Sequence, residues 1–300
     1  MKERRRKKRP SALGGDGATN SSSSVNSAWQ RSNLGYKERF VDDFEYNNIR
    51  VRQFPCRAVF ERAVRDALGS CFVDHLNSAT YDDEVDNDRD PVPDTAFTVW
   101  ESSVLLGMYA SRKDVWKKLI GTKKLHSSKP IVTLELGAGA GVASLLVATS
   151  GVLERKCDYY VVMTDLPSII NFTKLNIHAN IDKIVENAVL LTQPLRWGRI
   201  EDIKALPHEV CRPDVILAAD LLYTIDKSVI AALAETVILL TGRVAVFAVC
   251  KQHRPESVTF FLTLVQESFE LRHVPASTVD DLHASDEDFS IVELWRKRIR

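Results

Sequence analysis

The 300-residue sequence predicts an α/β fold in which a mostly parallel sheet carries helices on both faces. The first observation is the apolar run 131–136, which leads into Gly137, Gly139 and Gly141 and then into a helix of small residues. A strand, a tight turn and a helix in this order are typical of a nucleotide-binding sheet. The second observation is that further apolar runs alternate with helical patterns. The third is a pair of consecutive strands near the C-terminal end.

The strands of the main sheet are predicted from continuously apolar runs, which are typical of parallel strands buried on both faces. They are expected at residues 131–136, 159–164, 189–191, 214–220, 243–250, 269–274 and 290–295. The intervening helices are expected at residues 142–148, 166–180, 230–240 and 257–268. Side chains predicted to face inward from the last helix are Phe260, Phe261, Leu264 and Val265.

The region before the main sheet has a different pattern. Residues 36–54 are rich in aromatic and β-branched side chains, which predicts one or two edge strands, and residues 60–76 show helical spacing. Residues 96–110 predict a turn or short strand and then a helix. Side chains of this helix expected in the core are Leu105, Leu106 and Tyr109.

The net charge is zero, but residues 2–9 form a basic block and residues 82–90 an acidic block. We therefore expect a disordered basic and serine-rich tail at 1–35, an N-terminal extension with an acidic linker at 36–94, and a compact domain at 95–300. The basic block fits a nuclear localisation signal, a nucleic-acid arm or a solvated tail.

Composition excludes several classes of protein. No apolar run approaches the roughly 18 residues of a membrane span, and no signal-peptide core follows the basic start, so a cytoplasmic or nuclear protein is expected. The five cysteines form no C-x-x-C pair, and the seven histidines show no metal-ligand spacing. Neither a disulfide framework nor a metal site is predicted.

The spacing of the glycines in the turn distinguishes between two classes of cofactor. A dinucleotide-binding fingerprint has glycine or alanine at its sixth position, where this chain has Val142 if counting starts at Gly137. The arrangement E-x-G-x-G-x-G, which starts at Glu135, instead resembles motif I of class I S-adenosylmethionine (SAM) methyltransferases. The alternative is a glycine-bearing turn without a ligand.

Three further residues have both a ligand-binding and a structural interpretation. Asp165 ends the second strand, where a carboxylate accepts hydrogen bonds from ribose hydroxyls, but it also suits a helix N-cap. Trp100 fits a cofactor wall, a core residue or a hydrophobic staple. Trp197, which follows the third strand, fits adenine stacking or a cap on the sheet edge.

Asp220 ends the buried strand expected at 214–220, and Tyr223 lies three residues further on. A carboxylate at a buried strand end is costly without a partner, and α/β sheets bind ligands at this edge.

From residue 96 to residue 295 the chain resembles the seven-β-strand protein-lysine methyltransferases, which modify non-histone proteins such as chaperones and translation factors. The motifs that carry the resemblance are Val99-Trp100, Glu135 to Gly141, Asp165, Asn176-Ile-His-Ala-Asn180, Leu195-Arg196-Trp197-Gly198 and Ala219-Asp220-Leu221-Leu222-Tyr223, the family's D-x-x-Y signature.

The resemblance implies a class I methyltransferase sheet of seven strands. It also implies SAM as cofactor and a lysine acceptor in a protein partner. We further expect a monomer, and the lack of a long apolar run predicts no membrane partner. The SAM contacts implied, including the motif I glutamate, are Trp100, Glu135, Gly137, Ala138, Gly139, Asp165, Trp197 and Ala219. Asp220 and Tyr223 would form the catalytic and substrate end.

The chain departs from the family pattern in three places. Arg196 stands where the family usually has an acidic or small residue, residues 56–90 are longer than typical, and the 35-residue head has no counterpart. Rival interpretations are a methyltransferase for arginine or another acceptor, an NAD-binding oxidoreductase, and a non-catalytic interaction module. Nucleic acid is expected to bind only through the tail at residues 2–9.

Overall fold

The computed structural model describes residues 43–68, 94–125, 129–152, 158–208, 210–282 and 284–297. The predicted tail at 1–35 and the acidic block at 82–90 lie outside these ranges. Within them, no helix is long and apolar enough to cross a membrane, and no three potential metal ligands lie together.

The main sheet has seven strands in the order β5-β4-β3-β6-β7-β9-β8. Only β9 runs antiparallel to its neighbours, and it pairs with both β7 and β8. This is the class I methyltransferase sheet that the sequence predicts. The strands are β3 (Ile131–Leu136), β4 (Tyr159–Asp165), β5 (Ala188–Pro194), β6 (Val215–Ala219), β7 (Val244–Cys250), β8 (Phe269–Val274) and β9 (Phe289–Arg296).

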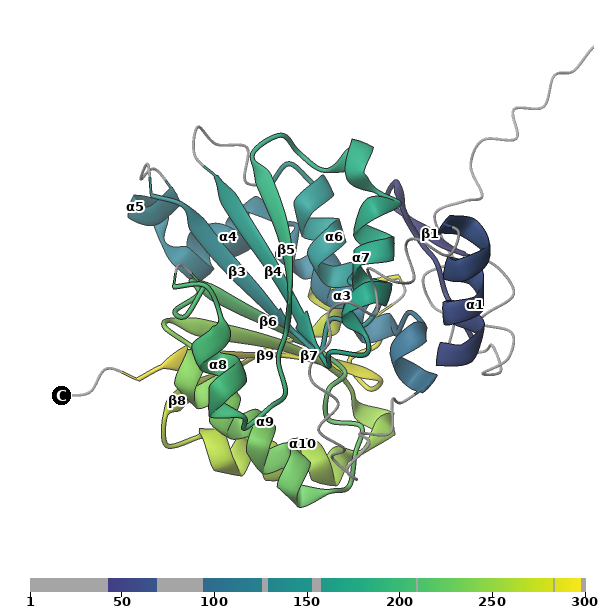
Figure 1. Ribbon diagram of the computed structural model, residues 1–300. Helices are drawn as coiled ribbons and strands as arrows, with labels where there is room; N and C mark the ends of the chain where they lie inside the picture. Colours follow the sequence, from purple (N-terminus) through teal and green to yellow (C-terminus); the bar gives the residue numbers. More distant parts are fainter. Residues whose placement is uncertain are drawn as a thin grey trace, which may run out of the picture.

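Helices cover both faces of this sheet, as Figure 1 shows. On one face lie α3 (Glu101–Ala110), α4 (Lys113–Ile120), α6 (Val142–Thr149) and α7 (Ile170–His178). On the other lie α8 (Ile200–Ala205), α9 (Lys227–Leu240) and α10 (Pro255–Val265). A short helix, α5 (Thr122–Leu125), precedes β3. Each face buries its own apolar cluster, and this burial stabilises the fold by the hydrophobic effect.

The N-terminal extension forms a separate two-stranded sheet rather than edge strands of the main one. β1 (Phe44–Tyr46) and β2 (Ile49–Val51) are joined by a turn in which Asn47 and Asn48 both have positive φ. That backbone conformation matches the twist of a hairpin, which explains why two asparagines occupy it. The helix α1 (Arg57–Leu68) follows, and a 3-10 turn, η2 (Asp94–Phe97), leads into α3.

Several element boundaries differ from the prediction. α7 begins at Ile170, because residues 167–169 form a turn before the helix. α8 was not predicted, since its six residues are too few to show a helical period. Leu264 is exposed rather than inward, while Phe261 and Val265 are buried as expected. Leu105, Leu106 and Tyr109 are buried in the core, which confirms their prediction.

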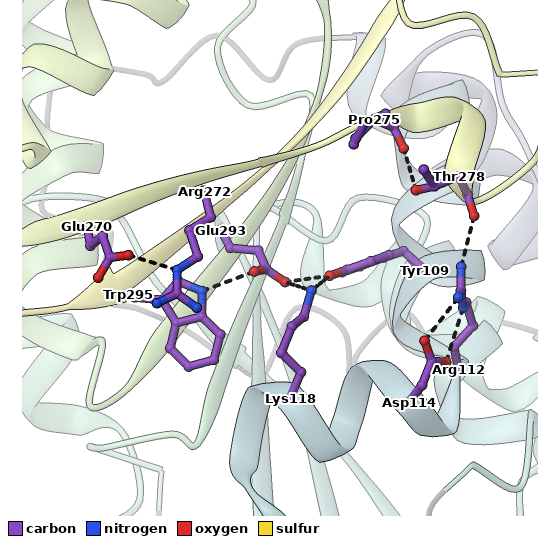
Figure 2. A network of polar contacts seen from close by, with 10 residues as sticks. All are labelled: Tyr109, Arg112, Asp114, Lys118, Glu270, Arg272, Pro275, Thr278, Glu293 and Trp295. Atoms are coloured by element: carbon purple, nitrogen blue, oxygen red, sulfur yellow. Dashed lines mark hydrogen bonds and ion pairs between the residues drawn. The ribbon is translucent and has the colours of Figure 1, made fainter.

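A buried ionic network ties α3 and α4 to β9 (Figure 2). Glu293 is 1% exposed and accepts hydrogen bonds from the Tyr109 hydroxyl and, at 3.0 Å, from Trp295 Nε1. Lys118 Nζ lies 2.6 Å from the same carboxylate. Burial, together with the hydrogen bond to Glu293, raises the pKa of Tyr109 above its ordinary value. The carboxylate is satisfied by three donors, so its loss should be costly.

We expect Glu293→Gln to reduce the free energy of unfolding by about 1–3 kcal/mol. The amide nitrogen that replaces one carboxylate oxygen would face a donor, either Trp295 Nε1 or the Tyr109–Lys118 pair. Urea unfolding followed by circular dichroism measures the loss. Asp114→Asn is the control, because the ion pair between Asp114 and Arg112 is exposed and should contribute under about 0.5 kcal/mol. Equal losses in both variants would contradict the prediction.

Candidate active site

A cavity of about 560 Å³ opens at the carboxyl ends of β3, β4 and β6. The chain winds outward from β3 through β4 to β5 on one side and through β6 to β7 on the other. Open α/β sheets bind ligands where the strand order reverses in this way, which here is between β3 and β6. All ten residues predicted for the site line this one cavity: Trp100, Glu135, Gly137, Ala138, Gly139, Asp165, Trp197, Ala219, Asp220 and Tyr223.

The glycine turn presents bare main chain to the cavity. Gly137 has φ +58° and Gly139 has φ +50°. Residues with a Cβ adopt such a backbone conformation only with strain. A Cβ on Gly137 would lie 2.5 Å from the Leu221 side chain, and one on Gly139 would lie 3.1 Å from the Ala96 carbonyl oxygen. A methyl group at either position would therefore crowd the wall. The turn fits an adenosyl ligand that lies against the backbone itself.

Asp165 stands at the end of β4, beside this turn. Its carboxylate accepts the Gly139 N–H and the Leu166 N–H, both at 2.7 Å. Burial raises the pKa of Asp165 to about 6, although these two hydrogen bonds act in the opposite direction. The N-cap interpretation is wrong, because the cap position of α7 is Ile169 and no side chain caps that helix. Each carboxylate oxygen keeps a second lone pair, so the group can still accept from a ligand.

Glu135 lies at the base of the cavity and is 2% exposed. It accepts the N–H of Ser144, in the first turn of α6, at 3.2 Å. Burial raises the pKa of Glu135 to about 7, with the charge of Asp165 adding to the effect. Two carboxyl groups with raised pKa values therefore share one cavity. Such pairs favour a cationic ligand, because its charge restores the ionised form of both.

Two tryptophans line the cavity. Trp100 is at the cap position of α3 and donates its indole N–H to the Thr95 carbonyl oxygen at 2.9 Å. Trp197 approaches the glycine turn, since a Cβ on Gly137 would lie 3.3 Å from its ring. Neither ring is fully buried, so both are available for planar contact with a ligand.

Arg196, a departure from the family pattern, is held by Asp202. The guanidinium donates to both carboxylate oxygens, from Nε at 2.9 Å and from a terminal nitrogen at 3.0 Å, and the Arg196 N–H donates as well. Bidentate pairs of this kind have a fixed geometry. Arg196 therefore links the loop that carries Trp197 to Asp202 on α8, and the carboxylate of Asp202 pairs with the charge of the arginine.

Asp220 and Tyr223 lie where β6 ends. Asp220 has φ +56°, a left-handed conformation that costs most residues about 1–2 kcal/mol but that aspartate tolerates better. Its carboxylate accepts the Cys250 N–H at 3.3 Å, which links it to the end of β7. Tyr223 is 44% exposed at the mouth. Burial of part of its ring and the charge of Asp165 raise the pKa of its hydroxyl.

The structure adds residues that sequence reasoning missed. Thr98 and Arg254 line the cavity, and Arg254 Nε donates to the Tyr223 carbonyl oxygen at 3.3 Å. Thr173 on α7 donates to the Gly139 carbonyl oxygen at 2.8 Å and so holds the glycine turn from behind. No local signal marks these residues, because each acts through a contact with a distant segment.

Comparison with known families decides the identity of this site. A family model described as lysine methyltransferase matches residues 81–268, which is more than half of the chain. The chain belongs to this lysine methyltransferase family. It is therefore a SAM-dependent methyltransferase, and the cavity at the carboxyl ends of β3 and β6 has a shape and a donor set that suit SAM. The family match excludes the NAD-dependent interpretation.

Solved structures give only distant similarities. The magnesium protoporphyrin IX methyltransferase of Synechocystis PCC 6803 is 14% identical, with 79% of this chain and 97% of that one covered and a TM-score of 0.42. A TehB-like SAM-dependent methyltransferase from Corynebacterium glutamicum is 14% identical, with 63% and 88% covered and a TM-score of 0.38. A comparison with curated proteins finds no match. The strand order itself establishes the fold class.

Proposed function

We propose that this methyltransferase modifies the ε-amino group of a lysine in a protein. The observation that carries the proposal is the placement of Asp220, a carboxylate held in a left-handed conformation where β6 opens into the cavity. Tyr223 stands beside it and is exposed at the mouth, where a side chain from another protein can reach it. The family's description supports the same acceptor.

The residues of the chain have simple tasks in this reaction. SAM, when bound, supplies a methyl group that is already activated on a sulfonium, so positioning of the acceptor is the main requirement. Asp220 accepts a hydrogen bond from the acceptor amine and orients its lone pair toward the cavity. Tyr223 forms the wall along which the aliphatic part of the lysine lies. Aromatic faces also attract an ammonium group.

The acceptor amine must be neutral before it can attack. A free lysine has a pKa of about 10.4, so most of it is protonated at neutral pH. The walls of the cavity are mainly apolar side chains and bare backbone, and such surroundings favour the neutral amine. Proton loss to solvent at the open mouth then leaves the amine in place beside Asp220.

The test is transfer of tritium from methyl-labelled SAM into a proteome from cells that lack this enzyme. The labelled protein is hydrolysed, and chromatography separates methylated lysine from methylated arginine. We expect label in methyl-lysine only, and prior acylation of the lysines in the proteome should abolish transfer. Label in methyl-arginine would contradict the lysine proposal. SAM binding without transfer to any protein would favour a non-catalytic interaction module.

A further inference from the structure

The sequence leaves the role of the N-terminal extension open, and the structure shows how it is attached. The hairpin β1–β2 lies beside α7 (Figure 1), and the side chains of Asn176 on α7 and of Asn180, two residues past the helix end, bind the outer edge of the hairpin. Asn180 accepts the Arg50 N–H at 2.8 Å and donates to the Arg50 carbonyl oxygen at 2.7 Å. Asn176 accepts the Arg52 N–H at 2.9 Å and donates to the Arg52 carbonyl oxygen at 3.4 Å.

The two carboxamides replace the neighbouring strand that β2 would otherwise need on this edge. Asn176 and Asn180 are both 0% exposed; Asn176 lies on α7, and Asn180 stands four residues later at the cap position of the 3-10 turn Ile181–Lys183. Arg50 and Arg52 are two residues apart, so their outward-facing backbone groups repeat at the spacing of a strand. Unpaired backbone groups at a covered edge are costly, which explains why this edge has two matched partners.

The chain continues from β2 directly to the wall of the cavity. The side-chain amide oxygen of Gln53, Oε1, accepts hydrogen bonds from the Thr98 hydroxyl at 2.9 Å and from the Val99 N–H at 3.0 Å. The Phe54 N–H donates to the Phe97 carbonyl oxygen at 3.0 Å. Residues 95–100 contain four lining residues of the cavity, yet they belong to no strand of the main sheet. In the hairpin segment, Gln53 and Phe54 form hydrogen bonds to this wall.

Aromatic packing holds the same segment from a second direction. Phe54, Phe60, Phe97 and Phe172 are each at most 6% exposed. Ring centroids lie 5.0 Å apart for Phe97 and Phe172 and 6.0 Å apart for Phe54 and Phe172. The four rings come from the end of the hairpin, from α1, from η2 and from α7. The cavity wall is thus packed onto the helix that also holds the glycine turn through Thr173.

We propose that Gln53, with Asn176 and Asn180, positions the cavity wall at residues 95–100 against the glycine turn and so sets the affinity for SAM. None of the three touches the cavity, so they are positioning residues. The approach of the Ala96 carbonyl oxygen to Gly139 shows how closely the wall is held. This inference rests on the assignment of the cavity to SAM. A wall that is in place for only part of the time weakens the apparent affinity by that fraction.

The experiment compares binding of S-adenosylhomocysteine with unfolding in full-length variants. Gln53→Leu removes the acceptor of two buried donors, and we expect about tenfold weaker binding by isothermal titration, as for a wall in place about a tenth of the time. Gln53→Glu keeps an acceptor oxygen and should restore most of the affinity. The matched control is Glu293→Gln, which weakens the contacts between β9 and the helices α3 and α4. It should lower the unfolding midpoint and leave the affinity unchanged.

An unchanged affinity in Gln53→Leu, or an equal loss in Glu293→Gln, overturns the positioning role. Absence of binding by the wild-type protein overturns the SAM assignment as well, so the two failures are distinguishable. Should Gln53→Leu not fold, Asn180→Asp takes its place. That change keeps an acceptor for the Arg50 N–H and removes only the amide donors, at a site outside the cavity. Weaker binding then supports the proposal, and wild-type affinity overturns it.

Discussion

Asp220→Asn is expected to reduce methyl transfer by about 10²–10⁴-fold while S-adenosylhomocysteine still binds within a few-fold of the wild-type affinity. Asparagine tolerates the left-handed backbone at this position and keeps an oxygen for the Cys250 N–H, so the loop should stay in place. What it loses is the negative charge that orients the amine. Alanine would add backbone strain to that loss and would be harder to interpret.

The measurement pairs isothermal titration with tritium transfer into the acceptor proteome. Asp226→Asn is the control, since it makes the same charge change in the same loop. Asp226 caps α9 by accepting the Ser228 N–H at 2.8 Å, and asparagine serves equally well at that position. The control should therefore transfer methyl groups at the wild-type rate. Transfer by Asp220→Asn near that rate would remove Asp220 from the chemistry.

Asp165→Ala is expected to weaken binding of SAM and S-adenosylhomocysteine by about 10–100-fold, as for the loss of charged hydrogen bonds. The change removes the acceptor of the Gly139 N–H and of the Leu166 N–H, and it removes the carboxylate predicted to bind the ribose. Asp182→Ala, at an exposed position on the 3-10 turn Ile181–Lys183, is the control. Unchanged affinity in Asp165→Ala would refute the ribose assignment.

The raised pKa values add a pH dependence to the same binding event. The pKa of Asp165 is about 6 in the folded protein and about 4 in the unfolded chain. Between about pH 4 and pH 6 the folded protein therefore keeps a proton that the unfolded chain has lost. Stability from this group is therefore complete below about pH 4 and is lost as the pH rises through 6. Ribose hydroxyls prefer the ionised carboxylate, so affinity should rise from about pH 5 to pH 7 in wild type. Titrations in buffers of different ionisation enthalpy should show proton release, and Asp165→Ala should reduce the pH dependence to the part that Glu135, with a pKa of about 7, contributes.

Local patterns in the sequence were enough for much of this site. Gly137 and Gly139 are needed because the backbone there has positive φ, and such a need is visible in the residue type alone. Asp165 and Asp220 follow apolar runs, and parallel strands bring their carboxyl ends to one edge of the sheet. Strand order therefore gathered the predicted residues that end or follow the strands around one cavity, and Trp100 reaches the same cavity from the start of α3. Their individual roles stay predictions until the variants above are measured.

Other features depended on contacts that no local pattern records. The N-cap interpretation of Asp165 was wrong, because α7 begins at Ile170, five residues later, with Ile169 at its cap position. The extension could have been an edge of the main sheet, but it forms a hairpin of its own whose outer edge is bound by the distant side chains of Asn176 and Asn180. Thr173, Gln53 and the Arg254 side chain act on segments far away along the chain.

The sequence by itself determined the class of fold and the edge of the sheet expected to bind the cofactor. It did so because periodicity and glycine content reflect the local needs of the backbone. Only the tertiary structure decided how the N-terminal segment serves the site. Arg50 and Asn180 are 130 positions apart, and such pairs are chosen by the complementarity of packed surfaces rather than by the residues next to them in the chain.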